Sequence, residues 1–205
     1  MTLKHSVAVQ NNKGERKPQK KREKRPPKKI TEKYLYNSGL AYLQRFTASS
    51  AHFHKVMMRK IDRSCKHHVD QSREDCETLL QKTILKFQDL GLLDDTAYAR
   101  GMVTSLRRRG LSSKAILFKL LQKGLSQDEI LQALASIDAD DENADITAGL
   151  RLARRKKIGP YRTRDKGEEK ELAQLARSGF DYATSRKILS MDLDTAEDLI
   201  NSQSF

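Results

Sequence analysis

The stretch RRRGLSSKAILFKLLQKGLSQDE, residues 107–129, decides the fold class because it contains the same helix-to-helix joint twice. Each joint reads GLS, at 110–112 and at 124–126. Glycine ends a helix because it enters the left-handed conformation without a Cβ clash. Serine starts the next helix because its side-chain oxygen accepts an orphan backbone N–H. A repeated short joint predicts a serial array of small helical units, which usually offers a long surface to a long partner.

The same pattern, a helix-ending glycine followed by a capping residue, recurs on both sides of this stretch. GFD stands at 179–181, and a longer form, GLLD, stands at 91–94. Between the joints, from Thr31 onward, apolar residues recur at helical spacing, and no segment alternates with period two. We therefore expect an all-α chain with three tandem three-helix repeats. Their expected ranges are 31–91, 92–139 and 140–205, the last including a terminal helical turn.

Composition favours a thin, elongated molecule over one large globular core. Of the 205 residues, 37% are hydrophobic and 33% are charged, and the chain has 6 Phe, 6 Tyr and no Trp. No apolar run approaches the roughly 20 residues that cross a membrane, and the N-terminus has no signal-peptide core. We expect a soluble cytoplasmic protein without a membrane contact.

Most of the net charge of +13 lies at the N-terminal end. Residues 1–33 carry 12 Lys and Arg against 3 Glu, a net charge of +9, which leaves +4 for the rest of the chain. Residues 1–30 are polar and nearly free of large apolar side chains after Val9, so we expect a disordered basic arm. The arm could attract nucleic acid, or it could simply keep the chain soluble.

A family resemblance emerges in the middle of the chain. The segments LGLLDDTAYA (90–99), RRGLSSKAI (108–116) and LLQKGL (120–125) resemble the signature of the RecX family, which regulates the bacterial RecA recombinase. The segment 172–189 resembles the last repeat of that family, and the likeness as a whole covers about 34–190. A polar insert, 62–73, and the long basic arm depart from the family pattern.

The resemblance implies three tandem three-helix repeats that form an elongated curved rod. Members are thought to lie in the groove of the RecA filament on DNA and to suppress its ATPase, strand-exchange and coprotease activities. We therefore expect a monomeric regulatory protein whose partners are RecA and its filament on DNA, with weak nonspecific binding of nucleic acid. The alternative is a nonspecific single- or double-stranded nucleic-acid-binding protein.

Two basic groups are the candidate partner- or DNA-binding residues. They are Arg107, Arg108, Arg109, Lys114, Lys119 and Lys123 in the second repeat, and Arg154, Arg155, Lys156, Lys157, Tyr161 and Arg162 in the third. An aromatic ring among arginines can stack on a base while the arginines pair with phosphate. Each group could equally be a solvated helix end that complements the helix dipole.

The sequence predicts no catalytic set, no metal site and no cofactor. Cys65, His67, His68 and Cys76 fit no standard zinc spacing, and Cys76 falls on an apolar helical stripe. In the pair Asp94-Asp95, one carboxylate is expected to cap a helix. No glycine-rich phosphate loop and no nucleophile with a base is present. We therefore expect a binding protein that is not an enzyme.

Overall fold

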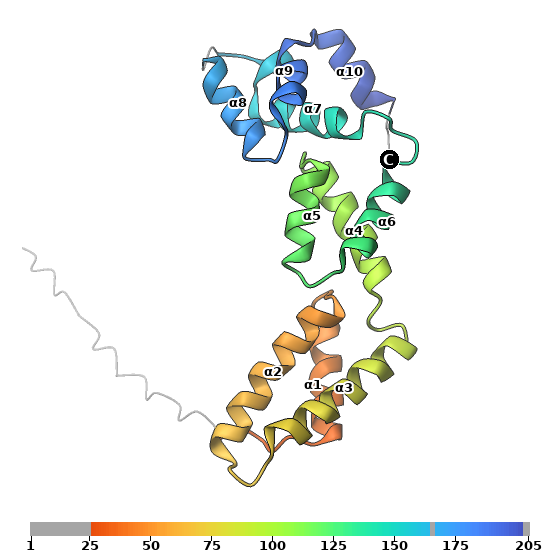
Figure 1. The fold of residues 1–205 in the computed structure, drawn as a ribbon, viewed down its shortest axis with the longest axis vertical. Coiled ribbons are helices and arrows are strands. Elements are labelled where there is room, and N and C mark those ends of the chain that lie inside the picture. Colours follow the sequence, from red (N-terminus) through yellow and green to blue (C-terminus); the bar gives the residue numbers. More distant parts are fainter. Residues whose placement is uncertain (1–25, 165–166, 203–205) are drawn as a thin grey trace, which may run out of the picture.

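The computed structural model describes residues 26–164 and 167–202, and in these ranges the secondary structure is entirely helical. Figure 1 shows three groups of helices that follow one another along the long axis of the molecule. Each group surrounds its own buried apolar cluster. The all-α prediction of three tandem repeats in an elongated curved rod is confirmed, whereas the residue boundaries 31–91, 92–139 and 140–205 stay a prediction. None of the described helices is long and apolar enough to cross a membrane.

The first repeat contains α1 (Glu32–Leu43), α2 (Ser50–His67) and α3 (Arg73–Asp89). Its core includes Leu35, Phe53, Met57, Ile61, Leu80 and Phe87. A Cβ at Gly39 would lie 2.7 Å from the rings of both Phe53 and Phe87, so a glycine is needed where α1 crosses them. Half of the expected polar insert, 62–67, is the last part of α2 and only 68–72 is a loop.

The second repeat contains α4 (Asp95–Arg108), α5 (Ser113–Leu121) and α6 (Gln127–Ile137). The third contains α7 (Ala144–Lys156), the 3-10 turn η1 (Gly159–Tyr161), α8 (Glu168–Ala176), α9 (Tyr182–Ser190) and α10 (Leu193–Asn201). The expected terminal turn is thus a full helix. Its N-cap is Asp192, whose carboxylate accepts from the N–H of Thr195.

The four helix-to-helix turns that the sequence predicts are all present. Glycines 91, 110, 124 and 179 all have positive φ. Asp94, Ser112 and Asp181 each accept a backbone N–H as N-caps. Ser126 and Glu129 form a reciprocal capping box at the start of α6.

The first two repeats are joined through the start of α2. The hydroxyl of Ser49 donates to the carbonyl oxygen of Lys123 at 2.7 Å, in the turn between α5 and α6. The next backbone N–H, of Ser50, donates to a carboxylate oxygen of Asp95 at 2.7 Å, in the first turn of α4. The second helix of one repeat is therefore capped by the repeat that follows it.

The last two repeats are joined by the same arrangement. The N–H of Ser112 donates to the carbonyl oxygen of Ser178 at 3.2 Å, in the turn between α8 and α9. The N–H of Ser113 donates to a carboxylate oxygen of Asp145 at 2.9 Å, in the first turn of α7. We call the contact at Ser49-Ser50 the first joint and the contact at Ser112-Ser113 the second joint. Because the two joints use corresponding residues, each repeat is attached to the next in a similar way.

Residues 27–30 are held against the far end of the first repeat. Gln71, in the loop between α2 and α3, exchanges two 2.8 Å hydrogen bonds with the backbone of Ile30, and the side chain of Ile30 is buried. The hydroxyl of Ser64 donates to the carbonyl of Lys28 at 2.9 Å. The segment expected to be unstructured therefore does not extend to residue 30, and its larger part, 1–25, lies outside the described residues.

Candidate binding groove between the first two repeats

A cationic groove of about 720 Å³ lies between α2, the C-terminal half of α4 and the end of α5. Five of the residues that line it are cationic, and none of its lining residues, all within the described ranges, carries a carboxylate. The cations are Lys55, Arg59, Arg109, Lys119 and Lys123. A concave surface with charge of one sign concentrates oppositely charged ligands. The groove therefore suits a phosphate or carboxylate chain.

The first joint brings these cations together from three helices. Lys55 and Arg59 are one turn apart on the exposed side of α2, so both point away from the core. Lys119 and Lys123 lie at the C-terminal end of α5, where the helix dipole favours cations. The bond from Ser49 to the Lys123 carbonyl sets the end of α5 against the start of α2.

His52 lies at the α2 side of the groove. Burial lowers the pKa of its imidazole, and the charges of Lys123, Arg59 and Lys55 lower it further. Near neutral pH the ring is therefore uncharged and offers one donor and one acceptor. Its protonation responds directly to any anion that enters the groove.

Only some of the basic residues predicted in the second repeat line the groove. Arg109, Lys119 and Lys123 line it, whereas Arg108 and Lys114 are exposed elsewhere on the second repeat. Sequence reasoning missed His52, Lys55 and Arg59. Their position opposite the apolar stripe of α2 could mark them as exposed, but not as neighbours of α5.

The structure corrects the prediction that Arg107 is part of the binding surface. Its side chain is 2% exposed, and its guanidinium pairs with the carboxylates of Asp138 and Asp145. It also donates to the carbonyl of Leu111 at 3.2 Å and to the hydroxyl of Ser113 at 2.6 Å. Burial lowers the pKa of this guanidinium, but the hydrogen bonds to the two aspartates outweigh burial and raise it. Arg107 is thus a structural cation of the second joint and not a surface contact.

The second predicted basic group is divided by the structure. Arg154, Arg155, Lys156 and Lys157 are exposed at the end of α7. Arg162 is engaged in two hydrogen bonds, of 2.9 and 2.6 Å, to the fully buried carboxylate of Glu171.

Tyr161 does not fit the stacking role expected from the sequence. Its ring packs on the third core, and its hydroxyl is buried. Burial, together with the nearby charge of Glu197, raises its pKa to about 12. The ring is therefore partly used by the core, and the structure gives no support to a role in base stacking.

The residues considered for zinc fall into pairs rather than one cluster, since the thiol of Cys76 contacts that of Cys65, and the rings of His67 and His68 lie 4.6 Å apart. Cys76 is buried in the first core, and the Nε2 atom of His68 lies 2.8 Å from the carbonyl oxygen of Pro27. Across residues 26–164 and 167–202, no three His, Cys, Asp or Glu side chains gather as a metal site would require.

The chain is similar in sequence to proteins named regulatory protein RecX. Residues 94–134 match the family model described as "RecX, second three-helix domain". The chain is 35% identical over 178 residues to "Regulatory protein RecX" of Myxococcus xanthus (strain DK1622), covering 84% of this chain and 94% of that one. It is 29% identical to the protein of that name from Agrobacterium fabrum (strain C58 / ATCC 33970), covering 80% and 86%.

A solved structure supports the same fold. The crystal structure of RecX from Lactobacillus salivarius superposes with a TM-score of 0.55 and covers 80% of this chain and 97% of that one. The two sequences are 22% identical, so this likeness bears on the fold alone.

Proposed function

Because the chain belongs to the RecX family of regulatory proteins, we propose that it binds RecA and the filament that RecA forms on DNA. In this proposal it acts in the cytoplasm, in DNA repair and recombination, and mainly inhibits the ATPase, strand-exchange and coprotease activities of the filament. The family consists of regulatory proteins, and the chain is accordingly not an enzyme. Family membership is the observation that carries the proposal.

The shape and charge of the rod support this function. An elongated array of repeats can contact several RecA protomers at once, so that many weak contacts add up to a useful affinity. The cationic groove attracts a filament that contains DNA. Binding must be stronger to one filament state than to another, because a ligand shifts an equilibrium only through differential affinity.

The test is the single-stranded-DNA-dependent ATPase rate of RecA, titrated with the full chain. We expect inhibition by the native protein and weaker inhibition by the double variant Lys55→Glu/Arg59→Glu. The matched control is Lys82→Glu/Lys86→Glu, which reverses two exposed charges one turn apart on α3, outside the groove. An unchanged ATPase rate at micromolar excess of the native protein would refute the proposed function.

A second candidate function is nonspecific binding of nucleic acid, which the five cations of the groove favour. Affinity based on phosphate contacts falls steeply with salt, with a logarithmic slope of about −0.7 per contact on single strands and −0.9 on duplex. Binding to RecA itself should persist at moderate salt and without DNA. A protein that binds only DNA and never RecA would establish this second function.

A further inference from the structure

The two joints of the rod align residue by residue. Both are close where the turn glycine meets the next helix, Gly124 at Ala51 and Gly179 at Ser112 and Ala115, but they differ at the position of Gly110. When Ser50 is aligned with Ser113, Thr47 takes the place of Gly110. A Cβ at Gly110 would lie 2.7 Å from the carbonyl oxygen of Ala148 and from the Cβ of Leu152. The glycine therefore lets α7 approach closely, and Leu152 is buried there.

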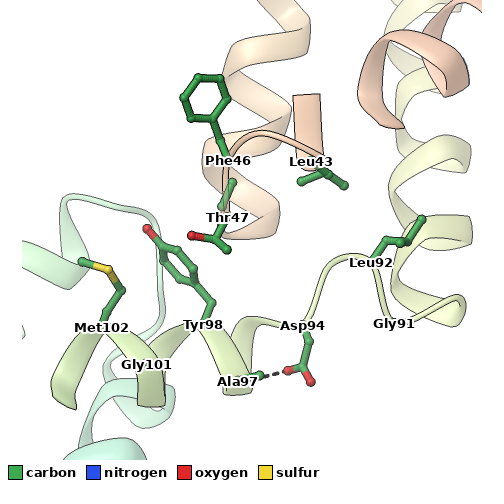
Figure 2. A pocket seen from close by; sticks show the side chains of 11 residues that line it. Leu43, Phe46, Thr47, Gly91, Leu92, Asp94, Ala97, Tyr98, Gly101 and Met102 are labelled. Atoms are coloured by element: carbon green, nitrogen blue, oxygen red, sulfur yellow. Dashed lines mark hydrogen bonds between the residues drawn. The ribbon is translucent and has the colours of Figure 1, made fainter. Parts of the chain in front are cut away.

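The first joint leaves an open apolar notch at the corresponding place. When Asp95 is aligned with Asp145, Tyr98 and Met102 of α4 take the places of Ala148 and Leu152. The notch has a volume of about 470 Å³. Its apolar walls are made by Leu43, Phe46, Ala48, Leu92, Ala97, Tyr98 and Met102. Figure 2 shows Tyr98 projecting from α4 toward Thr47, with Met102 on the same side of α4.

Large apolar side chains at the rim remain in contact with solvent. Phe46 is 54% exposed and Leu92 is 40% exposed. The carboxylate of Asp94 points away from the notch and accepts the N–H of Ala97 at 2.8 Å (Figure 2). The carboxylate of Asp95 is engaged with Ser50. The notch thus offers mainly apolar surface, which gains free energy when another apolar group covers it.

The notch opens beside the cationic groove. Met102 lines both, so a bound chain that crosses Met102 passes from an apolar site to five cations. On the opposite rim, the guanidinium carbon of Arg45 lies 5.9 Å from the ring centre of Phe46. Positive charge therefore flanks the apolar site, and the complementary ligand is acidic with a central apolar side chain.

We propose that the notch receives one large apolar side chain from an acidic segment of RecA, whose neighbouring carboxylates lie along the cationic groove. This inference rests on the proposed function, since it takes RecA as the partner. A protein segment fits better than nucleic acid. Every nucleotide carries a phosphate beside its base, whereas a peptide can place an uncharged side chain in the notch and its carboxylates further along the groove.

Gly101 provides a direct way to fill the notch. It lines the notch within α4, its φ is not positive, and a Cβ there would meet no atom within 4 Å. Replacing Gly101 with leucine adds a large apolar side chain at the lining of the notch, with a Cβ that meets no other atom, and favours the helix. Gly101→Ala is the matched control, because it changes the helix in the same way but leaves the space nearly empty.

The measurement is the affinity of full-length protein for RecA, with and without single-stranded DNA. We expect Gly101→Leu to weaken RecA binding by about 10- to 100-fold, the effect of losing the burial of one large apolar side chain. Gly101→Ala should bind within about twofold of the native protein. Both variants should keep the native affinity for single-stranded DNA alone. A photoreactive side chain in place of Phe46 should crosslink to a RecA segment with an apolar residue among carboxylates.

The outcomes separate the inference from the function on which it rests. If the native protein does not bind RecA, the proposed function and this inference both fail. If RecA binds Gly101→Leu as tightly as the native protein, only the inference fails. If Gly101→Leu loses affinity for DNA alone, a base occupies the notch and the protein segment is excluded. A crosslinked segment without carboxylates would also overturn the inference.

Discussion

Arg107 is the residue on which the second joint depends. Its guanidinium bridges the end of α6, at Asp138, to the first turn of α7, at Asp145. We expect Arg107→Met to lower the free energy of unfolding by about 3–5 kcal/mol, because it leaves two carboxylates close together without their cation. Arg107→Lys should recover only part of this loss, since one ammonium group cannot match the planar fork of guanidinium donors.

The measurement is urea denaturation followed by circular dichroism. Arg109→Met is the matched control, because Arg109 is exposed in the same helix end and its loss should change stability by no more than about 0.5 kcal/mol. Equal stability of the Arg107→Met and Arg109→Met variants would contradict the structural role of Arg107.

His52 makes binding in the groove sensitive to pH. In the free protein, burial first and then Lys123, Arg59 and Lys55 lower its pKa below the ordinary 6.5. An anion in the groove stabilises the imidazolium, so the pKa rises on binding and binding takes up a proton. We expect affinity for single-stranded DNA to increase as the pH falls from the pKa of His52 in the complex toward its lower pKa in the free protein, and to level off below that value.

A pair of histidine variants tests this expectation. His52→Gln should remove the increase in affinity at low pH, whereas His67→Gln, at an exposed position near the end of α2, should retain it. The same pH profile in the native protein and His52→Gln would assign the effect to another group.

At the residue scale, sequence reasoning succeeded for caps and failed for buried charge. Ser112, Ser126 and Asp181 were identifiable because a cap depends on only a few neighbouring residues. Arg107 was grouped with Arg108 and Arg109 because the run of three arginines resembles a solvated helix end. The contrary signal was the helical period, since Arg107 follows Val103 by four residues on the buried side of α4.

Among the elements, the glycines that end helices have different roles, and substituting Gly91 and Gly110 distinguishes these roles. Gly110 and Gly91 have similar φ values, +72° and +65°. A Cβ at Gly110 meets the backbone of α7, whereas a Cβ at Gly91 meets nothing within 4 Å. We expect Gly91→Ala to cost about 1–2 kcal/mol of stability from the left-handed backbone alone. Gly110→Ala should cost clearly more, because it also forces α7 away.

Thermal or urea unfolding of the two variants gives the difference directly. That difference measures the close approach of the second and third repeats, since the backbone strain is common to both variants. If the two substitutions destabilised the protein equally, the close packing seen at Gly110 would contribute nothing to stability.

The elements themselves could be predicted from the sequence, but not their mutual positions. Helix ends follow local rules, and for this reason the glycine, serine and aspartate residues of the four turns located the helix ends beside residues 91, 110, 124 and 179. The first joint depends instead on Ser49 meeting Lys123, 74 residues away. No local pattern specifies that pairing, so the cationic groove that it creates could not be derived from the sequence.

Over the whole molecule, the two joints should differ in how easily they open. The second contains the buried Arg107 with its two aspartates, whereas the first is held by the hydrogen bonds of Ser49 and Ser50 and by the contact of Gly124 with Ala51, beside an open notch. Local opening is easiest where few groups are buried. We expect the amide of Ser50 to exchange its hydrogen faster than the amide of Ser113, as measured by hydrogen exchange and mass spectrometry. Equal exchange rates would show that the joints are equally stable.

Two basic surfaces of the rod, the groove and the end of α7, could meet a polyanion, and their surroundings differ. The groove gathers cations from three helices with no carboxylate among its lining residues. By contrast, the basic end of α7 lies beside Glu197, which is 3.5 Å from Arg154. We therefore expect Lys55, Arg59 and Lys119, replaced together by glutamate, to weaken binding of single-stranded DNA. The logarithmic salt slope should become shallower by about 2, as expected for three lost phosphate contacts.

The matched variant replaces Arg155, Lys156 and Lys157 with glutamate and changes the net charge by the same amount. Its salt slope should remain near the native value, because the long-range effect of net charge is equal in the two variants and only the local contacts differ. Equal loss in both variants would mean that the rod attracts DNA by its overall charge. A loss confined to the α7 variant would move the binding surface to the third repeat.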